Sequence, residues 1–258
     1  MTEGGRSLGK LEGKVAIVTG AGQGIGKGIA IAFAREGSKV VIAEINAETA
    51  KSVAGEIREL GKEALDVVCD VGNEEQVQNM VDKAVAHFGP IDILVNNAQG
   101  YVPMRGVEDV EEKHWDKSLR TGLKATWYCC RAVFPHMKGR GGKIINFASA
   151  AAILGMEGMV TYNATKEAIR GFTRTAAREW GRHNINVNVI CPSALTPQMI
   201  WRQQNFPEEH EKQLEAVALH RVGDPEKDIG HVAVFLASED SDFITGHTFM
   251  VDGGFHMF

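Results

Sequence analysis

Residues 15–26 read VAIVTGAGQGIG, an apolar run followed by glycines at positions 20, 24 and 26. The run is typical of a buried strand that begins at Lys14, and residues 25–36 have the apolar spacing of a helix. Glycines between a strand and a helix permit a tight turn, let the backbone approach a pyrophosphate and let the helix pack close to the sheet. Because the chain has 29 glycines, three of them alone are weak evidence. The strand before them and the helix after them are the context that the motif requires. The stretch predicts a dinucleotide-binding turn.

Strand-like and helix-like patterns alternate along the rest of the chain. Short β-rich runs occupy residues 14–19, 40–43, 65–68, 91–95, 143–147, 185–190 and 248–251. Helix-period spacing covers residues 25–36, 47–60, 74–88, 111–137, 162–182 and 225–237. Such alternation is typical of parallel sheets, and most of the runs are apolar throughout, as strands covered on both faces are. We predict an α/β fold with a Rossmann-type, doubly wound, seven-stranded parallel sheet and helices on both faces.

Bulk properties fit a single domain over residues 1–258. The chain is 44% hydrophobic and 24% charged, close to globular averages, and it contains no internal repeat or linker. We expect residues 1–12 to be flexible. Residues 192–223 form a long polar-rich connection with embedded apolar side chains, which is typical of a substrate lid.

Charge and hydropathy narrow the class of partner. The net charge of -5 is spread along the chain, so there is no basic face for nucleic acid or for a membrane surface. The N-terminal stretch lacks an apolar targeting core and no later segment is apolar enough to span a bilayer, which favours the cytoplasm. The nine histidines and four cysteines have no metal-ligand spacing, so we expect no metal site. The expected partner is a small molecule.

Glu44 lies at the end of the second predicted strand, 18 residues beyond Gly26. A carboxylate in this place can accept hydrogen bonds from the adenosine ribose hydroxyls of a dinucleotide, and it repels a 2′-phosphate. No Arg or Lys occurs at positions 21–23, 45 or 46 to neutralise that phosphate. The sequence therefore predicts NAD rather than NADP as the cofactor, with a solvated strand-end acid as the alternative for Glu44.

Further motifs appear in a fixed order along the chain. They are Asp70-Val71, Asn96-Asn97-Ala98, Ser149, Tyr162-x-x-x-Lys166, Pro192 and Val251-Asp252-Gly253-Gly254. With the T-G-x-x-x-G-x-G turn at residues 19–26, this order resembles the single-domain branch of the short-chain dehydrogenase/reductase family from Gly13 to Gly254. A Y-x-x-x-K match alone arises by chance, so its position relative to the other motifs matters.

The resemblance implies a set of cofactor contacts. The turn residues Gly20, Gln23, Gly24, Ile25 and Gly26 would hold the pyrophosphate. By similarity, Asp70 and Val71 would contact the adenine, Asn97 the neighbouring ribose, and Pro192 with Leu195 or Thr196 the nicotinamide carboxamide. Tyr162 and Lys166 would line the nicotinamide end. The segment after Pro192 departs from the family pattern, since Ser193 replaces a glycine and Thr196 comes one position early.

Ser149, Tyr162 and Lys166 are the predicted catalytic residues. Oxidation of an alcohol by hydride removal also requires that the hydroxyl proton leave, so the site needs a base. A free tyrosine titrates near 10, and a cation one helical turn away, at Lys166, favours its phenolate. In the family this lysine also binds ribose hydroxyls, and the serine hydrogen-bonds the reacting oxygen. Taken singly, these residues are typical of ordinary packing and turns; taken together, they favour catalysis.

Two residues depart from the family near the expected site. Gly122 stands where members often have a catalytic Asn, and Gln99 stands where Asn-Asn-Ala is usually followed by Gly. A glycine inside a helix suggests a local bend or a close approach. We hypothesise that the Gln99 amide occupies the space of the missing Asn side chain, where it keeps a water chain or contacts substrate. Two independent changes are the alternative.

The side chains expected at the substrate are mostly apolar, which favours a hydrophobic secondary alcohol or ketone of the alicyclic, aromatic or steroid-like type. These candidates are Gln99, Tyr101, Met156, Met159 and Trp201. The resemblance implies a homotetramer that assembles through the helices at 111–137 and 162–182 and the C-terminal strand. Two alternatives remain: an NADP-dependent 3-oxoacyl thioester reductase, which shares the motifs, and a catalytically silent NAD-binding protein.

Overall fold

The computed structural model describes residues 9–257, and it contains the predicted sheet. Seven parallel strands lie in the order β3-β2-β1-β4-β5-β6-β7. Their bounds are β1 Val15–Thr19, β2 Lys39–Glu44, β3 Ala64–Val68, β4 Ile93–Asn96, β5 Gly142–Phe147, β6 Ile185–Pro192 and β7 Thr248–Val251. The α/β fold is confirmed.

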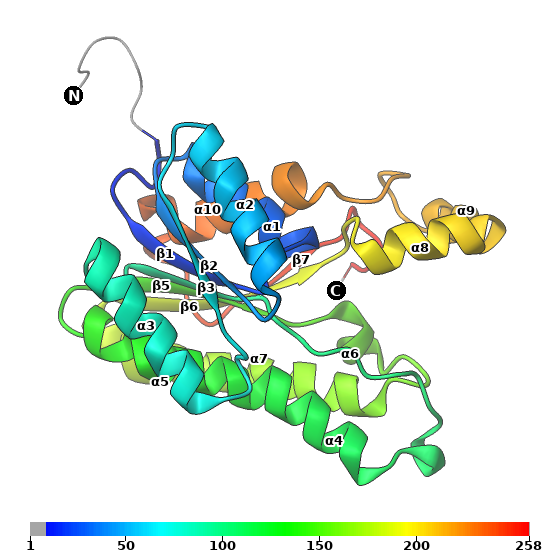
Figure 1. Ribbon diagram of the computed structural model, residues 1–258. Helices are drawn as coiled ribbons and strands as arrows, with labels where there is room; N and C mark the ends of the chain where they lie inside the picture. The colour runs from blue at the N-terminus through cyan, green and yellow to red at the C-terminus, as the bar shows by residue number, and fades with distance from the viewer. Residues whose placement is uncertain (1–8, 258) are drawn as a thin grey trace.

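Helices cover both faces of the sheet, as Figure 1 shows. One face carries α1 (Gly24–Arg35), α2 (Ala47–Glu59) and α10 (His231–Ala237), which pack with the sheet in one hydrophobic core around residues such as Ile29, Phe33 and Ile42. The other carries α3 (Glu74–Phe88), α5 (Ala125–Met137) and α7 (Val160–Trp180), whose core includes Met80, Leu94 and Met137. This two-core arrangement explains why the central strands are apolar on both sides.

The chain reverses direction across the sheet between β1 and β4. From β1 it moves outward through β2 and β3, then returns to β4 on the other side of β1 and moves outward again. Val18 pairs with both Ile42 and Val95, so the carboxyl ends of β1, β2 and β4 lie next to one another. Such a switch point leaves a crevice beyond the strand ends, where ligands bind in this type of sheet.

The predicted helix at 111–137 is three elements. α4 (Glu112–Leu119) and α5 are joined by η2 (Arg120–Lys124), a π-helical turn that contains Gly122. A wider turn of this kind inside a helix is often found at functional sites. The local bend expected at Gly122 is therefore present, although one continuous helix was the wrong description.

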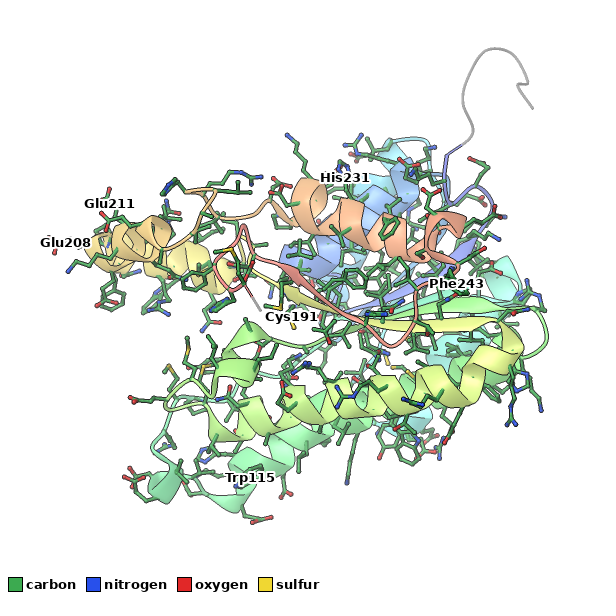
Figure 2. The ribbon with its side chains drawn as sticks, turned by 180° about the vertical axis from the view of Figure 1, so that it is seen from behind. Trp115, Cys191, Glu208, Glu211, His231 and Phe243 are labelled. Carbon is green, nitrogen blue, oxygen red and sulfur yellow. The ribbon has the colours of Figure 1, made fainter. Side chains whose placement is uncertain are left out.

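The segment 192–223 is more regular than a loop. It contains α8 (Pro197–Asn205) and α9 (Pro207–Glu215), which project beyond the carboxyl ends of the strands (Figure 1). Figure 2, the view from behind, places Glu208 and Glu211 on this projecting end and Phe243 at the opposite end of the molecule. Two further short elements are α6 (Ala150–Leu154) and η4 (Pro225–Gly230), a π-helical turn before α10.

The N-terminal segment was expected to be flexible over residues 1–12. Residues 1–8 lie outside the described residues, whereas residues 9–12 pack onto the fold. Leu11 is fully buried, and its N–H donates to the carbonyl of Glu36 at 3.0 Å. Within residues 9–257 no helix combines the length and the apolarity needed to cross a bilayer.

Candidate functional site

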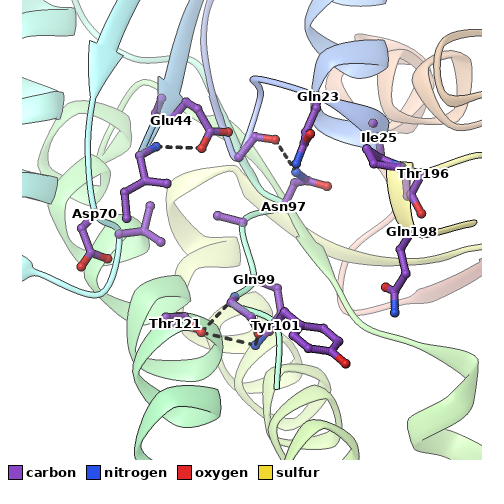
Figure 3. Close-up of a pocket in the computed structure, with 18 of the residues that line it drawn as sticks. Gln23, Ile25, Glu44, Asp70, Asn97, Gln99, Tyr101, Thr121, Thr196 and Gln198 are labelled. Atoms are coloured by element: carbon purple, nitrogen blue, oxygen red, sulfur yellow. Dashed lines mark hydrogen bonds between the residues drawn. The ribbon is translucent and has the colours of Figure 1, made fainter. Parts of the chain in front are cut away.

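A cavity of about 750 Å³ opens at the switch point (Figure 3). Most of the residues predicted to bind cofactor or substrate line it: Gly20, Gln23, Gly24, Ile25, Glu44, Asp70, Val71, Asn97, Gln99, Tyr101, Thr196 and Trp201. They come from the ends of β1 to β4, from the start of α1 and from α8 with its N-cap, which are far apart in the sequence. The fold thus brings these residues together in one place.

The glycine turn at the start of α1 has the geometry of an anion-binding site. Gln23 is the N-cap of α1, and its side chain makes no capping hydrogen bond, so the first N–H groups of the helix face the cavity without a side-chain partner. A Cβ added to Gly26 would lie 2.2 Å from the carbonyl oxygen of Gly20, so only glycine permits this close packing. Free N–H groups at a helix start attract phosphate, and the turn fits a dinucleotide pyrophosphate.

Asn97 and Thr19 hold the turn in place. The Asn97 Nδ2 donates to the carbonyls of Thr19 and Gly20 at 3.0 and 3.1 Å, and the Thr19 hydroxyl accepts from the N–H groups of Asn97 and Ala98 at 3.1 Å each. These bonds tie the end of β1 to the end of β4. Asn97 therefore has a structural task beside the predicted contact with the cofactor.

Acidic side chains line the cavity beside the ends of β2 and β3. Glu44 accepts from the N–H groups of Gly22 at 3.0 Å and Ile45 at 2.8 Å, which fixes its carboxylate beside the turn. Asp70 accepts from Arg120 at 2.8 Å. Burial raises the pKa of Asp70, but the hydrogen bonds from Arg120 and Gly72 outweigh that effect and leave the pKa below its usual value. No Lys or Arg is among the described residues that line the cavity.

Ser149, Tyr162 and Lys166 lie on neighbouring elements beyond β5. Ser149 follows β5 and is the N-cap of α6, where its side chain accepts from the N–H of Ala151 at 3.2 Å. Tyr162 and Lys166 lie in the first turns of α7. The Lys166 Nζ donates to the carbonyl of Phe147 at 2.9 Å and lies 5.6 Å from the centroid of the Tyr162 ring. These three residues are not among those that line the cavity itself.

The titration of this group is governed by burial. Burial raises the pKa of Tyr162, and a hydrogen bond with Ser149 opposes that shift without reversing it. Burial lowers the pKa of Lys166, whose exposed fraction is 4%, to about 8. A nearby cation alone was expected to lower the pKa of Tyr162. The direction here is the reverse, because the ammonium lies over the ring and bonds to Phe147 while burial disfavours the phenolate.

Several predicted residues lie elsewhere. Leu195 does not line the cavity. Its N–H donates to the carbonyl of Gly223 at 2.8 Å, so this N–H is not free to bind a nicotinamide carboxamide. Gly26, Pro192 and Met159 are also outside the lining. Met156 lines a second cavity of about 800 Å³, between the segment 104–107, α6 and α7.

The cavity also includes residues that were not predicted, namely Ala43, Ile45, Cys69, Ala98, Gly100, Thr121, Pro197 and Gln198. Those at strand ends could have been found, since they adjoin predicted positions in the chain. Thr121 adjoins Gly122, which was expected near the site, but its contact with Gly100 depends on the packing of η2 against the end of β4 and has no local signal. Its hydroxyl accepts from the N–H of Gly100 at 3.0 Å. Within residues 9–257 no group of His, Cys, Asp and Glu has the arrangement of a metal site.

Comparisons with known proteins agree with this geometry. Residues 20–256 match the family described as "Enoyl-(Acyl carrier protein) reductase". A 12α-hydroxysteroid dehydrogenase of a Clostridium species is 42% identical over 254 residues, with 96% of this chain and 98% of the relative covered. A 3-oxoacyl-(acyl-carrier-protein) reductase of Thermotoga maritima is 36% identical over 247 residues, with 95% and 98% covered.

Solved structures show the same fold. A 7α-hydroxysteroid dehydrogenase complexed with NADH and 7-oxo glycochenodeoxycholic acid is 36% identical and superposes with a TM-score of 0.89, with 95% of this chain and 94% of that chain covered. A protein described as a short-chain alcohol dehydrogenase from Sinorhizobium meliloti 1021 also has 36% identity and a TM-score of 0.89, with 95% and 97% covered.

Proposed function

This chain belongs to the short-chain dehydrogenase/reductase family of oxidoreductases, and from its site we propose that it uses NAD to interconvert a hydrophobic secondary alcohol and its ketone. The observation that carries the proposal is the occurrence in one fold of a cavity at the switch point, with a glycine turn at the start of α1, and of the group Ser149, Tyr162 and Lys166 at the starts of α6 and α7.

The acidic lining supports NAD. A cofactor with a 2′-phosphate would bring negative charge toward Glu44, with no lysine or arginine among the described lining residues to balance it. The charge of Asp70 is already paired with Arg120 at 2.8 Å. Glu44 is held by two backbone N–H groups and cannot turn away without losing them. A ribose diol can instead donate to this carboxylate.

We assign the chemical roles as follows. In alcohol oxidation, Ser149 donates a hydrogen bond to the reacting oxygen, and the Tyr162 phenolate takes the hydroxyl proton as the O–H bond breaks. When bound, the nicotinamide supplies the acceptor for the hydride, which leaves the carbon that bears the reacting oxygen, so that a ketone forms. Below about pH 8, Lys166 keeps a positive charge near Tyr162. In ketone reduction Tyr162 returns the proton to the oxygen.

Apolar side chains support a hydrophobic substrate. Tyr101 and Trp201 line the cavity, and the exposed fractions of their side chains are 64% and 55%. Trp201 also contacts Phe206, with the ring centroids 5.7 Å apart, so α8 and α9 present an aromatic surface next to the cavity. A relative that is a 12α-hydroxysteroid dehydrogenase favours a steroid-like alcohol.

A 3-oxoacyl thioester reductase is the second candidate, because one relative is a 3-oxoacyl-(acyl-carrier-protein) reductase. A substrate panel separates the two. The purified protein is assayed with NAD and NADP on hydroxysteroids, on simple alicyclic alcohols and, in reverse, on a 3-oxoacyl thioester. We expect turnover of the steroid or alicyclic alcohols with NAD. Turnover of the thioester with NADPH and of nothing else would establish the second candidate instead.

A further inference from the structure

Gln99 and Gly122 fit against each other beside the cavity. A Cβ added to Gly122 would lie 2.7 Å from Gln99 Oε1 and 2.3 Å from Thr165 Cγ2. Thr165 cannot easily give way, because its hydroxyl is bonded to the carbonyl of Thr161 at 2.8 Å and to the hydroxyl of Ser118 at 2.9 Å. Position 122 therefore has no room for a side chain while Gln99 and Thr165 occupy this space.

The carboxamide of Gln99 is poorly satisfied where it lies. Its Nε2 reaches the carbonyl of Gly100 and the hydroxyl of Thr121 only at 3.5 Å (Figure 3). Its Oε1 is buried and has no hydrogen-bond partner among the described residues. An unpartnered buried oxygen is costly, and such exceptions in native proteins call for a specific explanation. The one other such atom in the described part of the chain, Asn163 Oδ1, belongs to a residue that lines the second cavity.

We propose that Gln99 is a positioning residue: because its Nε2 bonds are long, its carboxamide can turn and bring Oε1 from its enclosed place beside Gly122 to an O–H donor inside the cavity. The donor is either a water on the route by which a proton leaves toward Lys166, or a second hydroxyl of the substrate. Because Gly122 has no side chain, the Gln99 carboxamide has space beside it. The inference rests on the proposed function, since both donors serve the alcohol/ketone reaction at the same site.

The kinetic test compares Gln99→Met, which keeps the length of the side chain and removes the acceptor, with Gln99→Glu, which retains an oxygen acceptor. Both are assayed with NAD on steroids that carry one or two hydroxyl groups. We expect Gln99→Met to lower kcat/KM by at least about tenfold and Gln99→Glu to recover part of that loss. Thermal unfolding and NADH binding of each variant show whether the fold and the cofactor site remain intact.

The two donors give different patterns. If the donor is a water, Gln99→Met lowers kcat on both steroids, leaves KM unchanged and alters the pH dependence of kcat. If the donor is a substrate hydroxyl, Gln99→Met raises KM on the two-hydroxyl steroid alone. The proposal is overturned if Gln99→Met matches the parent in kcat and KM on both steroids. It is also overturned if Gln99→Glu is as impaired as Gln99→Met while both keep the parent's Tm.

A stability test examines the fit without any substrate. In a Thr165→Ser background, which removes the Cγ2 atom, we expect Gly122→Ala to lower Tm by about 3 °C or more while Gln99 is present. The loss should disappear when Gln99→Ala is added. An equal effect of Gly122→Ala with and without Gln99 would reject the fit. If the parent turns over nothing, this test still stands, so the failure of the proposed function is distinguishable from the failure of this inference.

Discussion

At the scale of single residues, burial shifts the pKa values of Lys166 and Tyr162 toward their neutral forms. Burial lowers the pKa of Lys166 to about 8 and raises the pKa of Tyr162. Lys166 therefore releases its proton near pH 8, while Tyr162 keeps its proton to a higher pH. Alcohol oxidation needs the Tyr162 phenolate, whereas ketone reduction needs the protonated phenol.

The rate of oxidation should therefore rise with pH across the range from about 6 to about 10, because the fraction of phenolate rises, and the rate of reduction should hold until Tyr162 begins to lose its proton. Initial rates in both directions, measured from about pH 6 to about pH 10 at saturating cofactor, check this prediction. If oxidation does not vary across this range, loss of the Tyr162 proton is not required in the rate-limiting step.

Glu44 gives a second prediction at this scale. Replacing Glu44 with Ala removes the carboxylate that repels a 2′-phosphate, so the preference for NAD over NADP in kcat/KM should fall by about 10²-fold. Glu48→Ala removes an equal charge from the first turn of α2, outside the cavity lining, and should leave the preference unchanged. An NADP preference in the parent, or an equal effect of both changes, contradicts the role given to Glu44.

At the scale of elements, the contact between α1 and η4 depends on Gly28. A Cβ added there would lie 2.4 Å from the carbonyl carbon of Pro225 and 2.6 Å from the N of Glu226. A Cβ added to Gly55 in α2 would have no other atom within 4 Å. We predict that Gly28→Ala lowers the free energy of unfolding by about 1 to 3 kcal/mol. Gly55→Ala should raise it by about 0.5 to 1 kcal/mol.

Denaturant unfolding of the two variants and the parent measures this difference. The two substitutions are chemically the same and both lie inside helices, so only the surroundings differ. Equal changes in the two variants would show that helix propensity, rather than the packing of α1 on η4, controls stability at Gly28.

The strands were predictable because each is a short apolar run beside turn residues, and the glycine turn was predictable because its spacing carries its own geometry. The break at 120–124 was only hinted at by Gly122, since a π-turn depends on packing against Gln99 and Thr165. α8 and α9 were missed, although Thr196-Pro197 and Phe206-Pro207 place a proline at the first position of each helix, which is a helix-start signal.

The buried polar contacts could not be predicted from the sequence. The Asn96 Nδ2 donates to Asn146 Oδ1 at 2.9 Å, and the Asn146 Nδ2 donates to the Thr173 hydroxyl at 2.9 Å. This chain of bonds links β4, β5 and α7 inside the core. Nothing in the local pattern says that these side chains meet, because the partners are at least 27 residues apart in the chain.

At the scale of the whole molecule, we propose a homotetramer that assembles through α5, α7 and the β7 region. Trp127 on α5 is 41% exposed, and a Cβ added to Gly171 on α7 would enter open space. Sedimentation should give a mass four times the chain's 28.0 kDa. Gly171→Glu should reduce that mass, because a charge would be buried in the interface, while Gly55→Glu on α2 should not. A monomeric parent contradicts the proposed assembly.

The most direct measurement of the central claim is the rate of NADH formation from a hydroxysteroid by the parent and by Tyr162→Phe, with NADH binding measured for both. The variant keeps the ring and loses the group that takes the proton. We predict that kcat falls by about 10²- to 10⁴-fold while NADH affinity is kept. If the two proteins turn over at the same rate, Tyr162 is not the catalytic base. If both bind NADH and neither turns over any alcohol, the proposed activity itself is contradicted.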